Sequence, residues 1–261
     1  MKTILIYFFT ILLSNTLGAI SGMGGGVIIK PVLDTIGLHS LKSITFYSSI
    51  AVFTMSISSI YKQIRNSVMI NYKNVLGLSI GSLIGGVFGD IILTFFISFF
   101  KNDHKVQVIQ YILMIFTLLL ILYYNKFSNK KLNLSKLHYY ILIGILLGSL
   151  STFLGIGGGP INVAMFIFAF SLDIKTAVVY SIVTIFFSQL AKLSTIALTT
   201  GFGMFDLKML FCIIPAALLG GYIGSKISFM LSEKRVLFFY NAVVVFIIFI
   251  NIYNLISVCI K

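Results

Sequence analysis

Two glycine clusters, each inside a long apolar stretch, constrain the fold of this chain more than any other feature. Ser21–Gly26 reads Ser-Gly-Met-Gly-Gly-Gly, and Leu154–Gly159 reads Leu-Gly-Ile-Gly-Gly-Gly and is followed by Pro160. Glycine is the least favourable ordinary residue inside a helix, and it suits backbone that must kink or approach a ligand. A cluster that interrupts an apolar segment once in each half predicts a duplicated membrane protein with two broken helices.

Composition places much of the chain in contact with lipid. Of its 261 residues, 59% are hydrophobic and 10% are charged, whereas a soluble domain carries about 25% charged residues. The net charge is +13, but the lysines and arginines sit in short loops between apolar runs, as membrane insertion favours. No long polar segment remains for a nucleic-acid domain. We therefore expect a multi-pass protein of the cell membrane that contacts the lipid bilayer and no nucleic acid.

About eight apolar segments predict an all-α transmembrane bundle. A spanning helix needs about 20 apolar residues, so six segments fit one crossing each, whereas the two with glycine clusters are too long for one crossing and short for two. The segments are roughly 4–37, 44–60, 74–100, 107–124, 138–171, 176–200, 207–231 and 235–258. The first run resembles a signal peptide, but it leads directly into a repeated cluster, so we expect it to be retained.

The two halves align with each other. The basic linker 126–137 separates a first repeat, residues 1–125, from a second, residues 138–261. A shift of about 133 positions, growing to about 135 further on, aligns glycines, loop lysines and Tyr-Ser pairs. The aligned pairs include Gly22 with Gly155, Lys42 with Lys175, Tyr47 with Tyr180, Ser48 with Ser181, Lys73 with Lys208, and Gly89 with Gly224. Internal repeats of this kind are common in secondary transporters.

The sequence leaves the membrane topology open. If each broken segment crosses the membrane once, the basic loops near Lys62, Lys73 and the linker lie on the side of the termini, which would be cytoplasmic. If the broken segments are re-entrant hairpins, these loops face away from the termini. An odd number of crossings in each half makes the repeats inverted, and an even number makes them parallel.

The broken helices point to an anion site. A half-helix that starts after Gly26 or Gly159 presents free N–H groups and the positive end of its dipole to the turn. Such a turn can bind an anion through backbone, and Pro160 suits the first position of a helix. The alternative is that the glycines only permit a kink or a close helix crossing. The expected substrate-binding residues are Gly22, Gly24, Gly25, Gly26, Gly155, Gly157, Gly158, Gly159, Pro160, Asn162, Ser48, Ser181 and Lys192.

Polar residues inside the apolar segments each allow two interpretations. Ser48 and Ser181 lie on hydroxyl-rich helical faces, which either line a polar path or bond a neighbouring helix. Lys192 either adds charge to an anion path or reaches the membrane interface. Other polar residues of this kind are Lys30, Asp90 and Asn15. The small residues at four-residue spacing, Gly81, Gly85 and Gly89, and Ala216, Gly220 and Gly224, predict close helix packing.

Enzyme signatures are absent from the sequence. The three histidines lie in separate loops without HExxH spacing, and no GxxxxGK[ST] loop is present. Cys212 and Cys259 lie in apolar runs without metal or redox spacing, so a buried apolar role is expected. We expect no catalytic residues, no metal site and no cofactor.

These residues also carry a family resemblance. Two Gly-x-Gly-Gly-Gly clusters, each near the start of a half of about four apolar segments, resemble the sulfite exporter TauE/SafE family of membrane transporters. Pro31 after the first cluster, and Pro160 with Asn162 after the second, are also similar to the family's pattern. The resemblance covers essentially the whole chain. The resemblance implies a multi-pass transporter whose relatives export sulfite, sulfonates and other small organic anions. The first half departs from the second because Val27 stands where the second has Pro160.

We therefore expect a secondary transporter that exports a small anion, such as sulfite or an organosulfonate, by alternating access. The two glycine turns would meet near the bilayer midplane and hold the anion through N–H groups, helped by hydroxyls and Lys192. A proton and a sodium ion are both candidates for the coupling ion, and the oligomeric state is left open. The alternatives are a membrane scaffold or assembly protein, in which the glycines serve packing only, and a passive anion channel.

Overall fold

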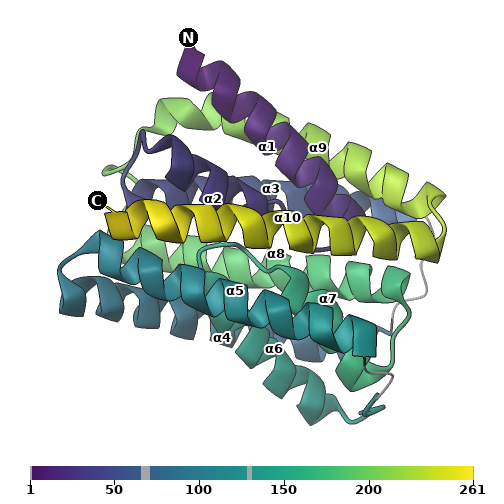
Figure 1. The fold of residues 1–261 in the computed structure, drawn as a ribbon. Helices are drawn as coiled ribbons and strands as arrows, with labels where there is room; N and C mark the ends of the chain where they lie inside the picture. The colour runs from purple at the N-terminus through teal and green to yellow at the C-terminus, as the bar shows by residue number, and fades with distance from the viewer. Residues whose placement is uncertain (1, 66–70, 128–130, 261) are drawn as a thin grey trace.

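The structure is a computed structural model that describes residues 2–65, 71–127 and 131–260; part of the predicted linker, 128–130 with Lys130, lies outside the described residues. Within these ranges the chain forms α-helices, one short 3-10 helix and no strand, so the predicted all-α bundle is confirmed (Figure 1). The first five helices are α1 (Lys2–Ser21), α2 (Gly26–Ile36), α3 (Leu41–Arg65), α4 (Tyr72–Phe100) and α5 (Asp103–Phe127). The others are α6 (Leu137–Phe153), α7 (Pro160–Phe170), α8 (Ile174–Thr199), η1 (Leu207–Met209), α9 (Leu210–Met230) and α10 (Glu233–Ile260).

Both glycine clusters lie between helices. The first separates α1 from α2, and the second separates α6 from α7. Positive φ angles occur at Gly22 (73°), Gly24 (73°), Gly155 (67°), Gly157 (71°), Gly158 (128°) and Gly159 (131°). Because L-residues with side chains rarely adopt these angles, only glycine lets the chain turn at these positions without strain.

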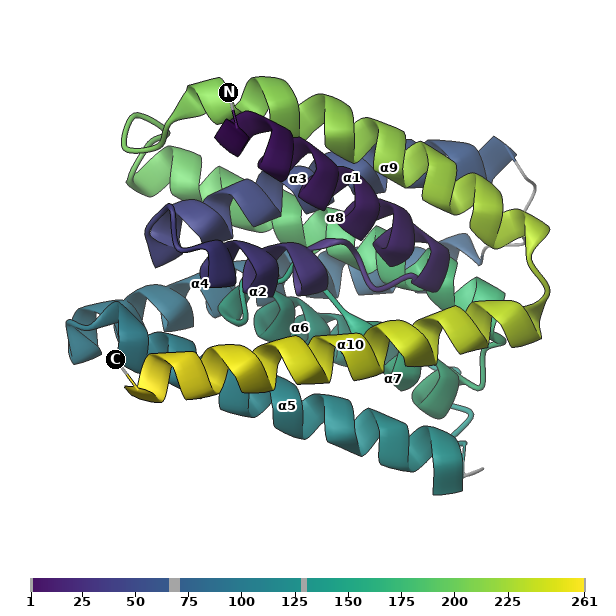
Figure 2. The same ribbon diagram turned by 45° about the horizontal axis from the view of Figure 1, so that its top comes forward.

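The chain reverses direction after each glycine cluster. In Figures 1 and 2, α1 runs from the left of the molecule toward the right and α2 returns to the left, whereas α6 runs leftward and α7 returns to the right. Each broken segment is therefore a hairpin that begins and ends on the same side. This geometry selects the hairpin alternative over the single crossing.

The hairpins make the two halves inverted with respect to each other. In Figure 1, α3 and α5 run rightward, while α8 and α10, their counterparts in the second half, run leftward. We call the side with the starts of α3 and α5 and the ends of α8 and α10 the termini face. The opposite side, with the ends of α3 and α5 and the starts of α8 and α10, is the linker face.

Contacts between the halves follow the same exchange. α4 packs on α6 and α1 packs on α9, while α3 packs on α8 and α5 on α10. If each helix is replaced by its counterpart in the other half, the contact of α4 with α6 becomes that of α9 with α1. The contacts of α3 with α8 and of α5 with α10 stay the same. Phe53 and Phe186, which are 133 positions apart, stack with ring centroids separated by 5.2 Å. Because corresponding residues meet there, a pseudo-two-fold axis passes between α3 and α8.

Glycines bring the crossed helices into backbone contact, as their four-residue spacing predicts. A Cβ atom on Gly85 of α4 would overlap the carbonyl oxygen of Ile145 in α6. In the corresponding pair, a Cβ atom on Gly220 of α9 would lie 2.8 Å from the carbonyl oxygen of Leu12 in α1. The packing interpretation of these small-residue faces is therefore confirmed.

Replacing Gly85 with leucine is expected to destabilise the protein. The new side chain must separate α4 from α6, and overpacking of this kind costs about 1–3 kcal/mol or more. Thermal unfolding in detergent, followed by circular dichroism, measures the effect. Gly203→Leu is the matched control because a Cβ atom there would meet nothing within 4 Å. Equal unfolding temperatures for the two variants would contradict the packing role of Gly85.

Long apolar helices make this a multi-pass membrane protein. In the described part of the chain, seven helical segments are long and apolar enough to cross a membrane, and α6 and α7 are shorter apolar helices. Large apolar side chains cover the outside of the bundle, as at Phe95, Phe116 and Phe249, which are 59%, 59% and 67% exposed. An apolar surface this extensive requires lipid.

Candidate functional site

The two glycine turns lie against each other inside the bundle. A Cβ atom on Gly24 would lie 3.5 Å from the carbonyl oxygen of Gly157, its counterpart in the other half. A Cβ atom on Gly26 would overlap the carbonyl oxygen of Ile156. All of these residues are buried. The absence of side chains is therefore what allows the two turns to meet.

Corresponding residues of α3 and α8 hold the turns in place. A Cβ atom on Gly22 would meet Val178 of α8 at 2.7 Å, and one on Gly155 would meet Thr45 of α3 at 3.0 Å. Val178 and Thr45 are 133 positions apart, as are the two glycines. The two hairpins thus pack in the same way, the first against α8 and the second against α3, each on a helix of the other half.

The turns present backbone donors that have no acceptor. Within the described part of the chain, the N–H groups of Gly24, Gly25, Gly157, Gly158 and Gly159 make no hydrogen bond. α2 and α7 begin directly after the turns, so the positive ends of both helix dipoles point to the same region. Buried N–H groups are rarely left unpaired, and a helix start with free N–H groups can bind an anion. The geometry therefore suits a small, negatively charged ligand.

Buried polar side chains near the turns also lack partners. Among the described residues, the unpartnered atoms on these segments are Asn15 Oδ1, Thr45 Oγ1, Ser48 Oγ, Ser151 Oγ, Thr152 Oγ1, Asn162 Nδ2 and both amide atoms of Gln189. Each of these residues is more than nine-tenths buried. An unsatisfied buried polar group costs about 1–3 kcal/mol. A cluster of them indicates a place for a polar ligand or for water.

The two halves do not contribute equally to this region. The Ser181 hydroxyl donates a hydrogen bond to the carbonyl oxygen of Gly22 at 2.5 Å, whereas the Ser48 hydroxyl has no partner. Pro160 begins α7, and its carbonyl oxygen accepts a hydrogen bond from the Tyr240 hydroxyl at 2.7 Å. Ser181 and Pro160 thus hold the turns in place, while the Ser48 hydroxyl stays buried without a partner.

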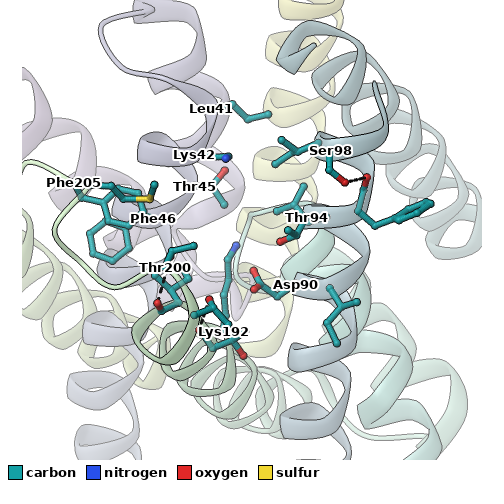
Figure 3. A pocket seen from close by; sticks show the side chains of 18 residues that line it. Leu41, Lys42, Thr45, Phe46, Asp90, Thr94, Ser98, Lys192, Thr200 and Phe205 are labelled. Atoms are coloured by element: carbon teal, nitrogen blue, oxygen red, sulfur yellow. Dashed lines mark hydrogen bonds between the residues drawn. The ribbon is translucent and has the colours of Figure 1, made fainter. Parts of the chain in front are cut away.

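Lys192 is an internal cation. Its side chain is 1% exposed, and its Nζ atom donates to the carbonyl oxygen of Thr152 at 3.4 Å, directly before the second turn. The alternative of reaching the membrane interface therefore fails for this residue. Figure 3 shows Lys192 of α8 and Asp90 of α4 pointing toward one another across a cavity. They do not form an ion pair; among the described residues, the ion pair is Lys30 with Asp34.

Lys30, by contrast, is neutralised within the protein. Its Nζ atom lies 3.3 Å from Asp34 Oδ2 and donates to Gln110 Oε1 at 3.0 Å. The Tyr111 hydroxyl donates to the same Asp34 oxygen at 2.8 Å, and Gln110 donates to the carbonyl oxygen of Phe153 at 2.6 Å. These bonds join α2 to α5 and to the end of α6, so Lys30 has a structural role beside the second turn.

A cavity of about 560 Å³ leads from the termini face toward the turns (Figure 3). Its mouth lies between the start of α3, the end of α4 and the end of α8, where Lys42, Ser98 and Thr200 line it. Its inner end reaches Thr45 and Lys192, which contact the second turn at Gly155 and Thr152. The cavity therefore extends from the termini face to side chains that contact the second turn and the end of α6.

Several residues of this region were not among the expected site residues. Ser151 and Thr152 lie shortly before the second glycine cluster, and this position in the sequence could have identified them as candidates. Thr45 and Gln189 lie on the hydroxyl-rich segments, but nothing in the sequence distinguished them from their neighbours. Asp90 enters the site because α4 packs beside α8, a contact that only the fold reveals.

Comparison with known proteins identifies the family. The family model for the sulfite exporter TauE/SafE matches residues 7–253. A probable membrane transporter protein of Methanocaldococcus jannaschii is 29% identical over 179 residues, which cover 64% of this chain and 62% of that relative. No solved structure matches the chain. Since the family model spans nearly the whole sequence, the chain belongs to the sulfite exporter TauE/SafE family of membrane transporters.

Proposed function

We propose that the protein is a secondary transporter that exports a small anion, with sulfite and organosulfonates as the first candidates, by alternating access. The observation that carries this proposal is the meeting of two glycine turns in which five N–H groups, those of Gly24, Gly25, Gly157, Gly158 and Gly159, have no acceptor among the described residues. The anion would bind to these N–H groups at the helix starts. Lys192 would supply a positive charge, and Ser48, Asn162 and Gln189 would supply further hydrogen bonds.

The shape of the protein supports a carrier over a passive channel. A channel needs a continuous path, whereas the large cavity is on the termini face and a cavity of only about 30 Å³ lies near the linker face. A scaffold protein would gain nothing from unpartnered buried donors, because each costs stability. The inverted halves, residues 1–125 and 138–261 with the linker between them, suit a mechanism in which the site is exposed alternately to either side.

Flux measurements test this proposal. Proteoliposomes that contain the purified protein are loaded with labelled sulfite. Sulfonates, sulfate and carboxylates are then added outside, one at a time, to find which of them compete for transport. We expect saturable flux that a proton or sodium gradient drives against the anion gradient. Flux that never builds a gradient with either ion would indicate a channel. No flux for any anion, with folded protein, would favour the scaffold.

The orientation in the membrane follows from the charges on the two faces. Among the residues whose side chains the structure describes, those with a positive charge near the linker face are Lys62, Lys73, Lys131, Lys136, Lys175, Lys226, Lys234 and Arg235. Those near the termini face are Lys42, Lys101, Lys105 and Lys208. Since cytoplasmic loops carry the excess of lysine and arginine, we propose that the linker face is cytoplasmic and that the large cavity opens to the outside.

Reporter fusions at the carboxyl end of α10 provide a measurement of orientation. In a bacterial host, a C-terminal alkaline phosphatase fusion is expected to be active and a C-terminal green fluorescent protein fusion to be dark, because the chain end lies on the outer face. A fusion after residue 127 is the matched control and should behave in the opposite way. A fluorescent C-terminal fusion would place the linker face outside.

A further inference from the structure

The small cavity near the linker face shares a plan with the large one. It has a volume of about 30 Å³ and lies between the end of α3, the start of α8 and the end of α9. The large cavity lies between the end of α8, the start of α3 and the end of α4. Since α3 corresponds to α8 and α4 to α9, exchange of the halves places one cavity on the other.

The correspondence holds residue by residue. Shifts of 133 positions on α3 and 135 positions on α4 carry lining residues of the large cavity onto lining residues of the small one. The pairs are Lys42 with Lys175, Thr45 with Val178, Phe46 with Val179, Asp90 with Ser225, Leu93 with Ser228, and Thr94 with Phe229. The remaining residue of the small cavity, Gln63, is 133 positions before Ile196, which lines the large cavity. A chance void would not reproduce every position.

Specific contacts keep the small cavity closed. The Lys175 Nζ atom donates to the carbonyl oxygen of Phe229 at 3.3 Å and lies 6.0 Å from the centre of the Phe229 ring. The Ser228 hydroxyl donates to the carbonyl oxygen of Ile20 at 2.9 Å, which joins α9 to α1. In the lining of the large cavity, the position that corresponds to Phe229 is Thr94, whose side chain is smaller and has no ring.

The closed cavity retains polar groups that have no partner in this state. Gln63 Oε1 and Ser225 Oγ are buried without a hydrogen bond, and their residues are 6% and 1% exposed. Such groups lose free energy in the dry, closed arrangement. Water or an anion would satisfy them if the cavity opened. The cost in the closed state and the gain in the open state bring the two arrangements closer in free energy.

We propose that Gln63, Lys175, Ser225 and Ser228 form a second anion vestibule, which opens on the linker face when the cavity on the termini face closes. This inference rests on the proposed function and adds the residues of the opposite-facing state. The vestibule takes the same small anion, which Lys175 meets at its mouth as Lys42 does on the other face. It is less charged inside, because Ser225 and Ser59 occupy the positions that correspond to Asp90 and Lys192.

Reaction of engineered cysteines with a membrane-impermeant thiosulfonate reagent tests the proposal. In a background without Cys212 and Cys259, Ser225→Cys reports on the small cavity from the linker face, and Thr94→Cys reports on the large cavity from the termini face. Val179→Cys is a second reporter in the small cavity if Ser225→Cys folds poorly. Ser79→Cys is the matched control because Ser79 is buried outside both cavities.

Removal of the Phe229 ring by Phe229→Ala is the decisive change, because it takes away the ring that Lys175 contacts and leaves the carbonyl oxygen that accepts from Lys175 in place. We expect it to speed labelling at Ser225→Cys at least tenfold and to slow labelling at Thr94→Cys by a similar factor, with Ser79→Cys unlabelled throughout. Faster labelling at Ser225→Cys without slower labelling at Thr94→Cys would show local loosening and overturn the proposal, as would no change at either site. Reciprocal labelling in a protein without anion flux would uphold the vestibule and refute the proposed transport.

Discussion

Lys192→Met is expected to weaken anion transport about 10- to 100-fold while leaving the protein at least as stable as the wild type. A charge-assisted hydrogen bond to a buried anion contributes about 1.5–3 kcal/mol, and each 1.4 kcal/mol is a factor of ten in affinity. Methionine keeps the length and apolar volume of the side chain but removes the charge. Because Lys192 is buried without an ion pair, its loss removes a desolvated charge and should not destabilise the fold.

Two measurements together distinguish this role from a structural one. Flux of the screened anion in proteoliposomes should fall, and the midpoint of thermal unfolding in detergent should stay constant or rise. Lys208→Met is the matched control, because Lys208 is an exposed lysine near the termini face that lines neither cavity, and its replacement should change flux by less than about threefold. A lower unfolding midpoint for Lys192→Met, with flux near normal, would assign Lys192 to packing instead.

Gly158→Ala is expected to reduce flux at least about 100-fold. Gly158 has a φ angle of 128°, and a Cβ atom there would overlap Ile185 and lie 3.3 Å from Asn162 Nδ2. Backbone strain at such an angle costs about 1–3 kcal/mol. The methyl group would also turn the N–H groups of the second turn away from the bound anion, and each lost hydrogen bond to a charged group costs about 1.5–3 kcal/mol.

Gly201→Ala provides the matched control for backbone strain. Gly201 has a φ angle of 69°, but a Cβ atom there would meet nothing within 4 Å. Its replacement should cost about 1 kcal/mol of stability and leave flux unchanged. Gly25→Ala tests the steric overlap of a new Cβ atom without backbone strain. Gly25 has an ordinary φ of −69°, and its new Cβ atom would overlap Asn15 Oδ1. Normal anion affinity in Gly158→Ala would refute the site at the glycine turns.

The sequence predicted the helices and the glycine breaks because both depend on local chemistry. Apolar runs of spanning length form helices in lipid, and clustered glycines end them. The direction of the chain after each break was not predictable from the sequence. It depends on where α2 and α7 find their packing surfaces, and these lie on helices that are far away in the chain, such as α10 for α2.

The roles of the two internal lysines show the same limit. Both lie in apolar segments, and the sequence offered each of them as a partner for an anion. Lys30 is neutralised by Asp34 and by Gln110, which is 80 positions away, whereas Lys192 faces a cavity whose other wall is α4. Residue type and spacing therefore identified the candidates, and only the tertiary contacts separate the structural lysine from the one near the site.

The crossed packing of α1 on α9 and of α4 on α6 has a consequence for the synthesis of the protein. α1 leaves the ribosome almost a full chain length before α9, its main packing partner. Until then the small and polar face of α1 around Asn15 and Thr16 has no helix against which to pack. The first half must therefore wait in the membrane, or beside the insertion machinery, until translation is nearly complete. Because each half finds its main packing partners in the other, we expect the two halves to fold together as a single unit.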